Sequence, residues 1–376
     1  MYSFADLDRT LSNQPPRIGV LLQAVNRGQG RQQLFAEQVP RILKQLAETT
    51  RIASIQASTA IEGYEVGDQR ARSIARDLDS SHFRDRNEKE FAGYRDAADR
   101  IASPNAYLVP ITYAYPFTLA TDLNRYTTRE PGRIKLDNNE IAERDDRGVR
   151  RVIFHCVDRD LVESVLQSLV IGYNDALTQQ AADPVLLLGL FILDFLAIHP
   201  VADGNGRLSR LLTAHELIRL GYDAPRYISL EQMIYDSKNS YYAALETSQR
   251  GWHEGQHDAW PWLTYFTTLL ADAYEKFETR VGEARPAQGM SKAGRVRHWA
   301  LEEAPPQFRF QDAVDALPGI SSATIRNSLN SLRDQGRLSA TLGRDALWTR
   351  AEPREALKTS VEDAAAHLPV RATATG

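Results

Sequence analysis

The segment "HPVADGNGRLSR", residues 199–210, brings together several residue types that do chemistry. The imidazole of His199 can accept a proton near neutral pH. The carboxylate of Asp203 is a hard oxygen ligand of the kind that binds Mg²⁺. A glycine-rich turn and two arginines three residues apart complete the segment: Gly204, Asn205, Gly206, Arg207 and Arg210.

The residues that follow this turn, "NGRLSRLLTAHELIRLG", predict a helix that stops at Gly221. The turn therefore lies at a helix N-terminus, where free backbone N–H groups and the positive end of the dipole form an anion site. Glycines let a phosphate approach the backbone closely. Arg207 and Arg210 share one face of the helix, and two guanidiniums suit an extended polyphosphate. The segment thus indicates phosphoryl or nucleotidyl transfer.

Other motifs with similar residues fit less well. A calcium loop that starts at Asp203 would need glycine and glutamate where Leu208 and Ala214 stand. The stretch "HELIR" at 215–219 lacks the second histidine of a zincin, and "GQGRQQ" at 28–33 lacks the third glycine of a dinucleotide loop. A helix start with incidental charges remains the alternative.

Most of the chain around this segment is predicted to be helical. Residues 183–199, "DPVLLLGLFILDFLAIH", are apolar nearly all round, as in a helix at the centre of a bundle that ends at His199. Residues 34–61 keep helical spacing, with an interruption at Pro40 and a stop at Gly63. Further helical segments are predicted at 68–102, 160–177, 239–250 and 260–281.

Two regions depart from this pattern. Residues 133–156 alternate weakly around the turn-prone "RDDRG" and end in the β-prone "VIFHC", which predicts a hairpin. Residues 282–294 have the composition of a linker. Residues 310–350 then read as helix, turn, helix and two short strands, an order that predicts a winged helix-turn-helix with Ser321 or Ser322 as a helix cap.

The winged helix makes a DNA-binding regulator the alternative to an enzyme. It would reach duplex DNA through residues 305–350. Residues 291–350 carry nine Lys or Arg against six Asp or Glu, a modest positive excess for such a role. Winged helices also act in dimerisation and in recruiting substrates. The side chains available for contact with DNA are Arg326, Asn327, Asn330 and Arg344.

The composition of the chain limits which other classes of function are expected. The 376 residues have a net charge of −4 and 43% hydrophobic content, so nothing marks the whole chain as a binder of nucleic acid or of membrane surfaces. The single cysteine, Cys156, excludes an internal disulfide and fits a buried structural position. The N-terminus has no signal-peptide pattern, and the longest apolar run contains Asp194, so we expect a cytoplasmic protein without a membrane span.

Residues 199–210 resemble the motif of the Fic family, His-x-Phe-x-(Asp/Glu)-Gly-Asn-Gly-Arg-x-x-Arg. Every functional position matches, and only the packing residue differs, because Val201 replaces the usual Phe. Valine fills less volume, so a differently seated loop and weaker activity are expected. "SYYAAL", "WPWLTYF" and the hairpin also resemble later parts of the family, which extends the resemblance over about residues 90–280.

The resemblance implies a mainly α fold, a Fic-type helical bundle with a small β-hairpin flap, joined to a C-terminal winged helix-turn-helix domain. The expected divisions are an N-terminal helical region with an inhibitory helix at 1–90, the Fic catalytic core at 91–284, the winged helix at 285–352 and a disordered tail at 353–376.

A second signature lies upstream. "STAIEG", residues 58–63, resembles the family's inhibitory motif, (Ser/Thr)-x-x-x-Glu-(Gly/Asn), with matches at Ser58, Glu62 and Gly63. A carboxylate at Glu62 can form a two-point pair with Arg210, the arginine expected to hold the γ-phosphate. A helix end with a surface glutamate and a glycine stop is the alternative.

The resemblance implies AMPylation: a Ser, Thr or Tyr hydroxyl attacks the α-phosphate of ATP, AMP is transferred and pyrophosphate leaves. Gly204, where the kinase-like Doc branch has Ala, favours nucleotide transfer over phosphorylation. The roles implied are a general base at His199, a Mg²⁺ ligand at Asp203, donors to the α- and β-phosphates at Gly204, Asn205 and Gly206, and arginines for the β- and γ-phosphates at Arg207 and Arg210.

Three further residues are candidates for the adenine side: Asn239, Tyr241 and Tyr242, with core packing as the alternative for the tyrosines. The expected partners are ATP with Mg²⁺ and a target protein whose extended segment adds a strand to the flap at 133–156. Removal of AMP from a modified target, with Glu62 positioning a water, remains an alternative at the same site. The sequence leaves a homodimer open.

Overall fold

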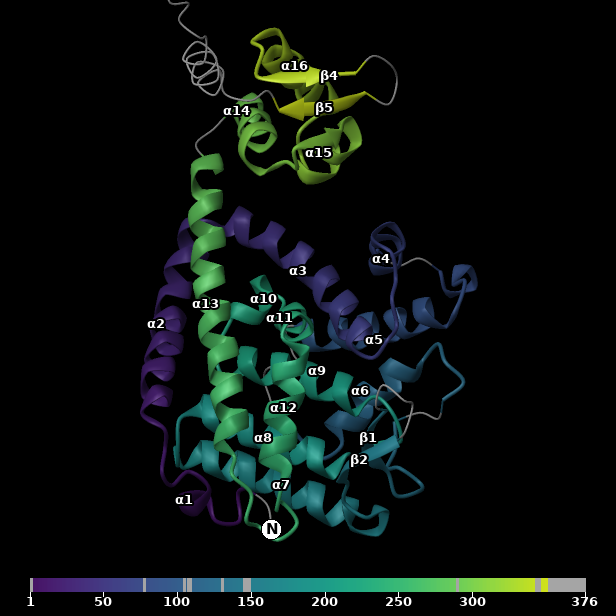
Figure 1. The fold of residues 1–376 in the computed structure, drawn as a ribbon, viewed down its shortest axis with the longest axis vertical. Coiled ribbons are helices and arrows are strands. Elements are labelled where there is room, and N and C mark those ends of the chain that lie inside the picture. Colours follow the sequence, from purple (N-terminus) through teal and green to yellow (C-terminus); the bar gives the residue numbers. More distant parts are fainter. Residues whose placement is uncertain are drawn as a thin grey trace, which may run out of the picture. The chain divides into compact units, whose positions relative to one another are not determined.

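The computed structural model describes residues 3–76, 79–103, 106, 110–129, 132–144, 150–288, 291–341 and 346–350, apart from the side chains of 37–38 and 283–288. It divides into two compact units, Met1–Val281 and Gly282–Gly376, which are treated separately below (Figure 1). The expected tail at 353–376 and the wing residue Arg344 lie outside the described residues. Among the helices that are described, none is long and apolar enough to cross a membrane.

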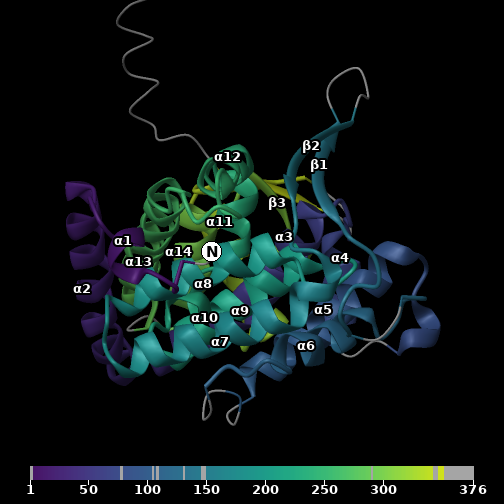
Figure 2. The same ribbon diagram turned by 90° about the horizontal axis from the view of Figure 1, so that it is seen from below.

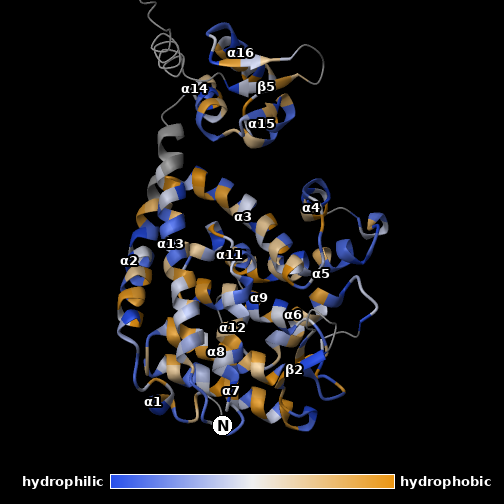
Figure 3. Ribbon diagram, viewed as in Figure 1, coloured by the Kyte–Doolittle hydropathy of each residue, from blue (hydrophilic) through white to orange (hydrophobic). Residues whose placement is uncertain are grey.

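Helix α8 (Pro184–Ile198) forms the centre of the first unit. All its residues from Val185 to Ile198 are buried, as its unbroken apolar sequence predicted. Asp183 caps its start by accepting from the N–H of Val185 at 2.9 Å. Helices α7 (Val162–Thr178) and α9 (Asn205–Arg219) pack against it. Hydrophobic residues are frequent along α7 and α8 in Figure 3.

Long helices flank this centre. The predicted break at Pro40 separates α2 (Pro16–Gln38) from α3 (Pro40–Ile61), although α2 begins well before the expected residue 34. Helix α2 lies against α13 (Trp260–Gln288), because a Cβ at Gly28 would come within 2.4 Å of the Tyr274 ring. The linker prediction was wrong for residues 282–288, which continue α13. Gly and Pro there disfavour a helix, but the other residues of this stretch, Glu, Ala, Arg and Gln, are good helix formers.

The charged stretch 68–102 contains two helices, α4 (Asp68–Ala75) and α5 (Arg86–Ala102), with a short 3₁₀ turn η1 (Ser80–His82) between them. Asp85 starts α5 by accepting from the N–H of Glu88 at 3.0 Å. Helix α6 (Tyr115–Asn124) packs on α5. The other elements of this unit are α1 (Leu7–Thr10), η2 (Arg159–Leu161), α10 (Ala224–Tyr227), α11 (Leu230–Asp236) and α12 (Lys238–Gln249).

The predicted hairpin is confirmed, in a shorter form. Strand β1 (Glu140–Arg144) pairs antiparallel with β2 (Arg150–His155), with a bulge after Ile141. Figure 2 shows the pair projecting from the body of the first unit. The turn at 145–149 lies outside the described residues. Cys156, directly after β2, is buried and free, and burial raises the pKa of its thiol to about 11.

The second unit has a core of its own, which includes Trp299, Phe308, Leu329 and Trp348. Its order is helix, strand, helix, helix, strand, strand, and its antiparallel sheet has the strand order β3-β5-β4. Ser321 caps the second helix of the expected pair, accepting from the N–H of Thr324 at 3.2 Å. The elements are α14 (Lys292–His298), a π-helical turn η3 (Trp299–Glu303), β3 (Gln307–Arg309), α15 (Phe310–Ala316), α16 (Ser322–Asp334), β4 (Leu338–Ala340) and β5 (Leu347–Arg350).

Candidate active site

His199 ends the central helix in the left-handed region, with φ 53°, and turns the chain out of the core. Its Nδ1 lies 3.1 Å from the carbonyl oxygen of Leu196. Because a carbonyl only accepts, Nδ1 carries the proton and Nε2 of the neutral ring is left as an acceptor. Burial lowers the pKa of the imidazole to about 4, although the Leu196 carbonyl favours the charged form. The ring is therefore neutral at pH 7 and can take a proton.

The loop after His199 is fixed by hydrogen bonds to its backbone. The side chain of Asn205 accepts from the N–H of Val201 at 3.1 Å and donates to its carbonyl at 2.7 Å. Asn139 donates to the same carbonyl at 3.3 Å, and the N–H of Lys135 donates to the carbonyl of Pro200 at 2.9 Å. Val201 itself is buried. The Asn205 amide thus supports the loop, and its expected role as a phosphate donor rests on its backbone N–H.

Two glycines shape the start of α9. Gly204 caps the helix with φ 91°, a conformation that L side chains rarely adopt. A Cβ on Gly206 would lie 2.6 Å from Oε1 of Glu62, so a side chain there would displace the Glu62 carboxylate. The same distance shows that a carboxylate oxygen lies directly against the first turn of α9, where the helix end favours an anion.

Glu62 reaches this point from the end of α3, where it is the C-cap residue and Gly63 has φ 85°. Its Oε1 accepts from Nη2 of Arg210 at 2.8 Å. Ser58 binds the same guanidinium twice: its Oγ accepts from Nε at 2.8 Å and its carbonyl from Nη2 at 3.0 Å. Glu62 therefore meets Arg210 through one oxygen, rather than through the expected two-point contact, because Ser58 takes Nε.

The environment of Arg210 favours its charged form. Its side chain is 3% exposed, and that of Glu62 is 31% exposed. Burial acts to lower the pKa of the guanidinium, but Glu62 and the hydroxyls of Tyr241 and Tyr94 raise it, and the net shift is upward. A buried arginine that depends on one acidic partner is a strong anion site once that partner leaves.

Arg207 does not face the same pocket. Its Nη1 lies 2.5 Å from Oε2 of Glu90, and both side chains are almost fully buried. The guanidinium also lies 5.5 Å from the ring centroid of Tyr64. Its Nη2 is 3.4 Å from the position of a Cβ on Gly204, so it supports the glycine turn from behind. The expected contact with the β-phosphate stays a prediction.

Asp203 belongs to a network of ion pairs that was not predicted from the sequence. Its Oδ2 is 2.5 Å from Nη2 of Arg129, which also pairs with Glu90 at 2.8 Å. The sequence did contain a signal for Glu90. It shares the helical spacing of Tyr94 and Ala97, and all three residues are buried on one face of α5. Arg129 and Tyr64 carried no such pattern.

The candidate metal position consists of one carboxylate. Across the described residues there is no group of three or more His, Cys, Asp and Glu side chains able to hold a metal. Asp203 is 50% exposed. A single accessible carboxylate fits Mg²⁺, which keeps several waters and is bound largely by substrate phosphates. It does not fit an ion held in an all-protein cage.

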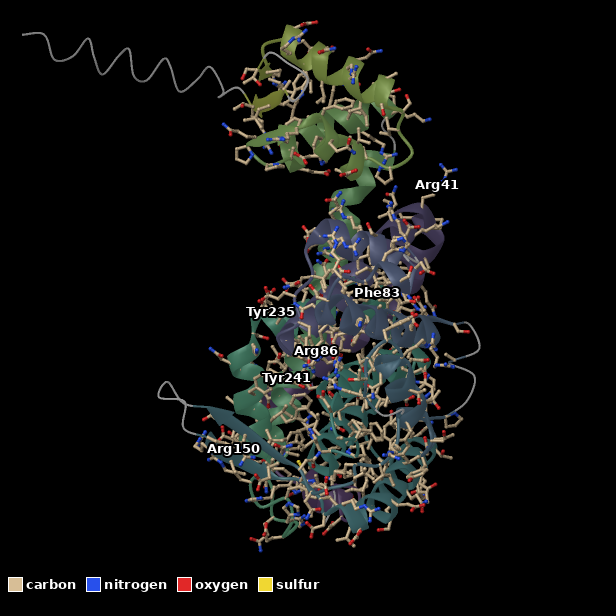
Figure 4. All side chains as sticks on the ribbon, turned by 90° about the vertical axis from the view of Figure 1, so that its right-hand side faces the viewer. Arg41, Phe83, Arg86, Arg150, Tyr235 and Tyr241 are labelled. Carbon is tan, nitrogen blue, oxygen red and sulfur yellow. The ribbon has the colours of Figure 1, made fainter. Side chains whose placement is uncertain are left out.

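A pocket of about 770 Å³ collects most of the predicted site residues. Tyr241 is buried with its ring edge against Trp262, whereas Tyr242 is 43% exposed. Figure 4 shows Tyr241 within the first unit and Arg150 on the hairpin. Strand β1 and Ile153 of β2 line the opposite side. The predicted residues that line the pocket are Glu62, His199, Asp203, Gly204, Asn205, Gly206, Arg210, Asn239, Tyr241 and Tyr242.

Comparison with known proteins identifies a family for part of the chain and a similar fold for most of it. The model of the Fic/DOC family matches residues 121–217. A Fido domain-containing protein of Dictyostelium discoideum is 28% identical over 97 residues, which are 26% of this chain and 64% of that protein. The crystal structure of a Fic family protein from Desulfovibrio desulfuricans G20 has a TM-score of 0.58 at 20% identity, covering 90% of this chain and 97% of that one. At that identity the likeness is one of fold.

The curated relatives are matched only in part. Besides the 64% of the Dictyostelium protein, the chain covers 11% of the ribonucleoside-diphosphate reductase small chain of Ostreid herpesvirus 1, with 41% identity over 63 residues. The short second match spans 15% of this chain.

Proposed function

The chain contains a Fic/DOC family domain, and we propose that it is a protein adenylyltransferase, which transfers AMP from ATP to a Ser, Thr or Tyr hydroxyl of a target protein or of itself. One observation carries this proposal. The carboxylate of Glu62 lies against Gly206 and Arg210, in a site built for an anion, beside a neutral His199 in a pocket of about 770 Å³. A pocket of this size accommodates a nucleotide.

His199 acts as the general base. Its Nε2 accepts the proton of the target hydroxyl, and the hydroxyl oxygen forms the new bond to the α-phosphorus of ATP. The bond from that phosphorus to the bridging oxygen of the β-phosphate breaks, and pyrophosphate leaves. The contact of Nδ1 with the Leu196 carbonyl supports this role, because it fixes the tautomer that leaves Nε2 free to accept.

The phosphates lie at the start of α9. The backbone N–H groups of the turn at 204–206 donate to the α- and β-phosphates, and Arg210 pairs with the γ-phosphate. Asp203 would hold Mg²⁺, an assignment that its half-exposed carboxylate supports. The bound ion would supply positive charge to offset that of the phosphates.

The remaining walls of the pocket are assigned to the adenine ring and to the target protein. The exposed ring of Tyr242 offers a face for adenine, Asn239 offers an amide, and Tyr241 positions its neighbour from the core. A target segment lies along β1, whose residues line the pocket, and is held in an extended form by main-chain hydrogen bonds.

Glu62 inhibits this reaction. Its carboxylate occupies Arg210 and the first turn of α9, so ATP meets a negative charge where its γ-phosphate would bind. Removal of AMP from a target, with Glu62 directing a water, is the competing activity at the same residues.

The second unit carries a separate proposal. We propose that this unit is a winged helix, which its element order and the strand order β3-β5-β4 support. Helix α16 buries Ile325 and Leu329 and exposes Arg326 and Asn327, which favours contact of that face with duplex DNA. Binding that weakens steeply with salt, and that is lost in Arg326→Ala, supports DNA contact; binding absent at low salt eliminates it.

Mass spectrometry tests the main proposal. The Glu62→Gly protein is incubated with ATP, Mg²⁺ and cell lysate, and tryptic peptides are searched for an added AMP group. Modified Ser, Thr or Tyr residues, absent when Glu62→Gly is combined with His199→Ala, support transfer. Loss of AMP from a pre-modified peptide with the wild-type protein, but not with Glu62→Gly, would favour the reverse reaction.

A further inference from the structure

Arg129 forms an ion pair with Asp203, the carboxylate that is assigned to the metal. Its Nη2 lies 2.5 Å from Oδ2 of Asp203, its Nη1 lies 2.8 Å from Oε1 of Glu90, and Nη2 also donates to the hydroxyl of Tyr64 at 3.0 Å. Glu90 is fully buried and holds Arg207 as well. The guanidinium is thus held at three points, on a buried carboxylate, a phenol and the half-exposed Asp203.

We propose that Arg129 is a second inhibitory contact, which competes with the divalent cation for Asp203 and is kept in place by Tyr64. The proposal rests on the proposed function, because it adds a layer of regulation to the same site. Through Tyr64, the contact of Arg129 with Asp203 connects the turn after α3 to the proposed metal position. The contact of Glu62 with Arg210 connects the same turn to the proposed γ-phosphate position.

The surroundings of Asp203 allow competition from two sides. Asp203 lines the pocket of about 770 Å³ that contains His199, and it also lines a second hollow of about 580 Å³, of which Arg129 forms part of the wall. Arg129 reaches the carboxylate from the second hollow, and a cation bound to ATP would reach it from the first. The side chain of Arg129 is 20% exposed and borders the second hollow, which offers space into which it can withdraw.

Tyr64 connects this contact to the end of α3. Its backbone N–H donates to the carbonyl of Thr59 at 3.0 Å, which ties it to the turn that carries Glu62. A movement of this turn that frees Arg210 would therefore also remove a hydrogen bond from Arg129. The two contacts are expected to be released together, so that the γ-phosphate site and the metal ligand become available in one step.

Electrostatics gives the direction of the effect. A guanidinium and a divalent cation both seek the Asp203 oxygens, and each repels the other. Removing the guanidinium frees the ligand and lowers the repulsion, so metal affinity must rise. If Arg129 instead affected the metal only through its charge, Tyr64→Phe would leave the affinity for the metal unchanged, because that variant keeps the guanidinium.

Paramagnetic NMR with Mn²⁺ alone tests the proposal, using the full chain without nucleotide. The apparent dissociation constant is read from the broadening of the backbone amide signals of Gly204 and Gly206. We expect Arg129→Gln to bind Mn²⁺ roughly two- to fivefold more tightly than the wild type, the range of a partly exposed charge pair. Tyr64→Phe is expected to give a smaller increase, and Arg129→Lys to stay near the wild type.

Arg86→Gln is the matched control. Arg86 also donates to the Tyr64 hydroxyl, at 2.9 Å, and contacts Glu90 at 3.4 Å, and its side chain is 65% exposed. Arg86 shares Tyr64 and Glu90 with Arg129, but its ion pair is with Glu90 rather than with Asp203. Its removal should therefore leave Mn²⁺ affinity unchanged. Arg86 is labelled in Figure 4.

Equal or weaker Mn²⁺ binding by both Arg129→Gln and Tyr64→Phe would overturn the proposal. Should Arg129→Gln fail to fold, as seen by thermal unfolding, Tyr64→Phe decides alone, because it removes one hydroxyl. The proposed function is judged separately, by AMP transfer in Glu62→Gly. Transfer without a change in Mn²⁺ affinity rejects this inference only, and a gain in Mn²⁺ affinity without transfer rejects the adenylyltransferase.

Discussion

Oε1 of Glu62 lies 2.8 Å from Nη2 of Arg210, although 148 residues of sequence separate them. The pair fills the site at the start of α9 that we assign to the terminal phosphate of ATP. Because Glu62 is partly exposed and Arg210 is buried, the carboxylate is the partner that can leave.

This relationship predicts a change in ATP-induced stabilisation. Glu62→Gly frees Arg210, so ATP should bind about tenfold more tightly and raise the unfolding temperature more than in the wild type, by mass action on the folded state. Differential scanning fluorimetry with and without ATP measures this. Glu65→Gly, on the same turn, is the control. Identical ATP-induced shifts in Glu62→Gly and the wild type would show that Glu62 does not compete with the nucleotide.

Glu90 is predicted to be a major contributor to stability. Its carboxylate is fully buried and pairs with Arg207 and Arg129. Glu90→Ala leaves those guanidiniums without their buried partner, which should cost about 3–5 kcal/mol in the free energy of unfolding. Urea denaturation measures the loss, with the exposed Glu48→Ala as the control. A loss no greater than in the control would mean that the network contributes little.

Val201→Phe addresses the departure from the family motif. Val201 is buried, and its backbone is bonded on both sides by Asn205, so the loop is already seated without the larger ring. Inserting a phenyl group should lower the free energy of unfolding by about 1–3 kcal/mol through overpacking. Val201→Leu serves as a milder comparison. Greater stability in Val201→Phe would instead reveal an unfilled space in the core.

His199 is predicted to titrate near pH 4. Burial lowers its pKa from the ordinary value of about 6.5 to about 4. Between these values the unfolded chain binds the proton and the folded chain does not, so this group lowers stability as the pH falls from about 6.5 to about 4. NMR titration of the imidazole, assigned by its absence in His199→Asn, gives the midpoint. A midpoint near 6.5 would contradict the buried, neutral base.

The chemistry of the motif could be predicted from the sequence because it is local. The apolar run before His199 and the glycine turn before α9 specify one helix end and one helix start, which bring the base beside the anion site. The contact of Glu62 with Arg210 could be expected only through the resemblance of 58–63 to an inhibitory motif. Its single-oxygen geometry could not, because it depends on Ser58 taking Nε of the arginine.

The charge network could not be predicted, since ion pairs between distant helices leave no periodic pattern. Arg129 follows α6 and Tyr64 follows α3, and only the packing of these helices on α5 brings them to Glu90. In the second unit, β3 has three residues, too few for alternation to be recognised. Helix α13 continues through residues 282–288, where Gly and Pro had indicated a linker, because composition alone does not separate the end of a helix from a linker.

Transfer of label from ATP tests the central claim most directly. Glu62→Gly protein is incubated with Mg²⁺ and ATP labelled on either the α- or the γ-phosphate, in parallel with Glu62→Gly/His199→Ala. The account predicts that protein gains label from α-labelled ATP only, and that the second variant loses it by a factor of at least about 100. Label from γ-labelled ATP, or undiminished transfer without His199, would contradict it.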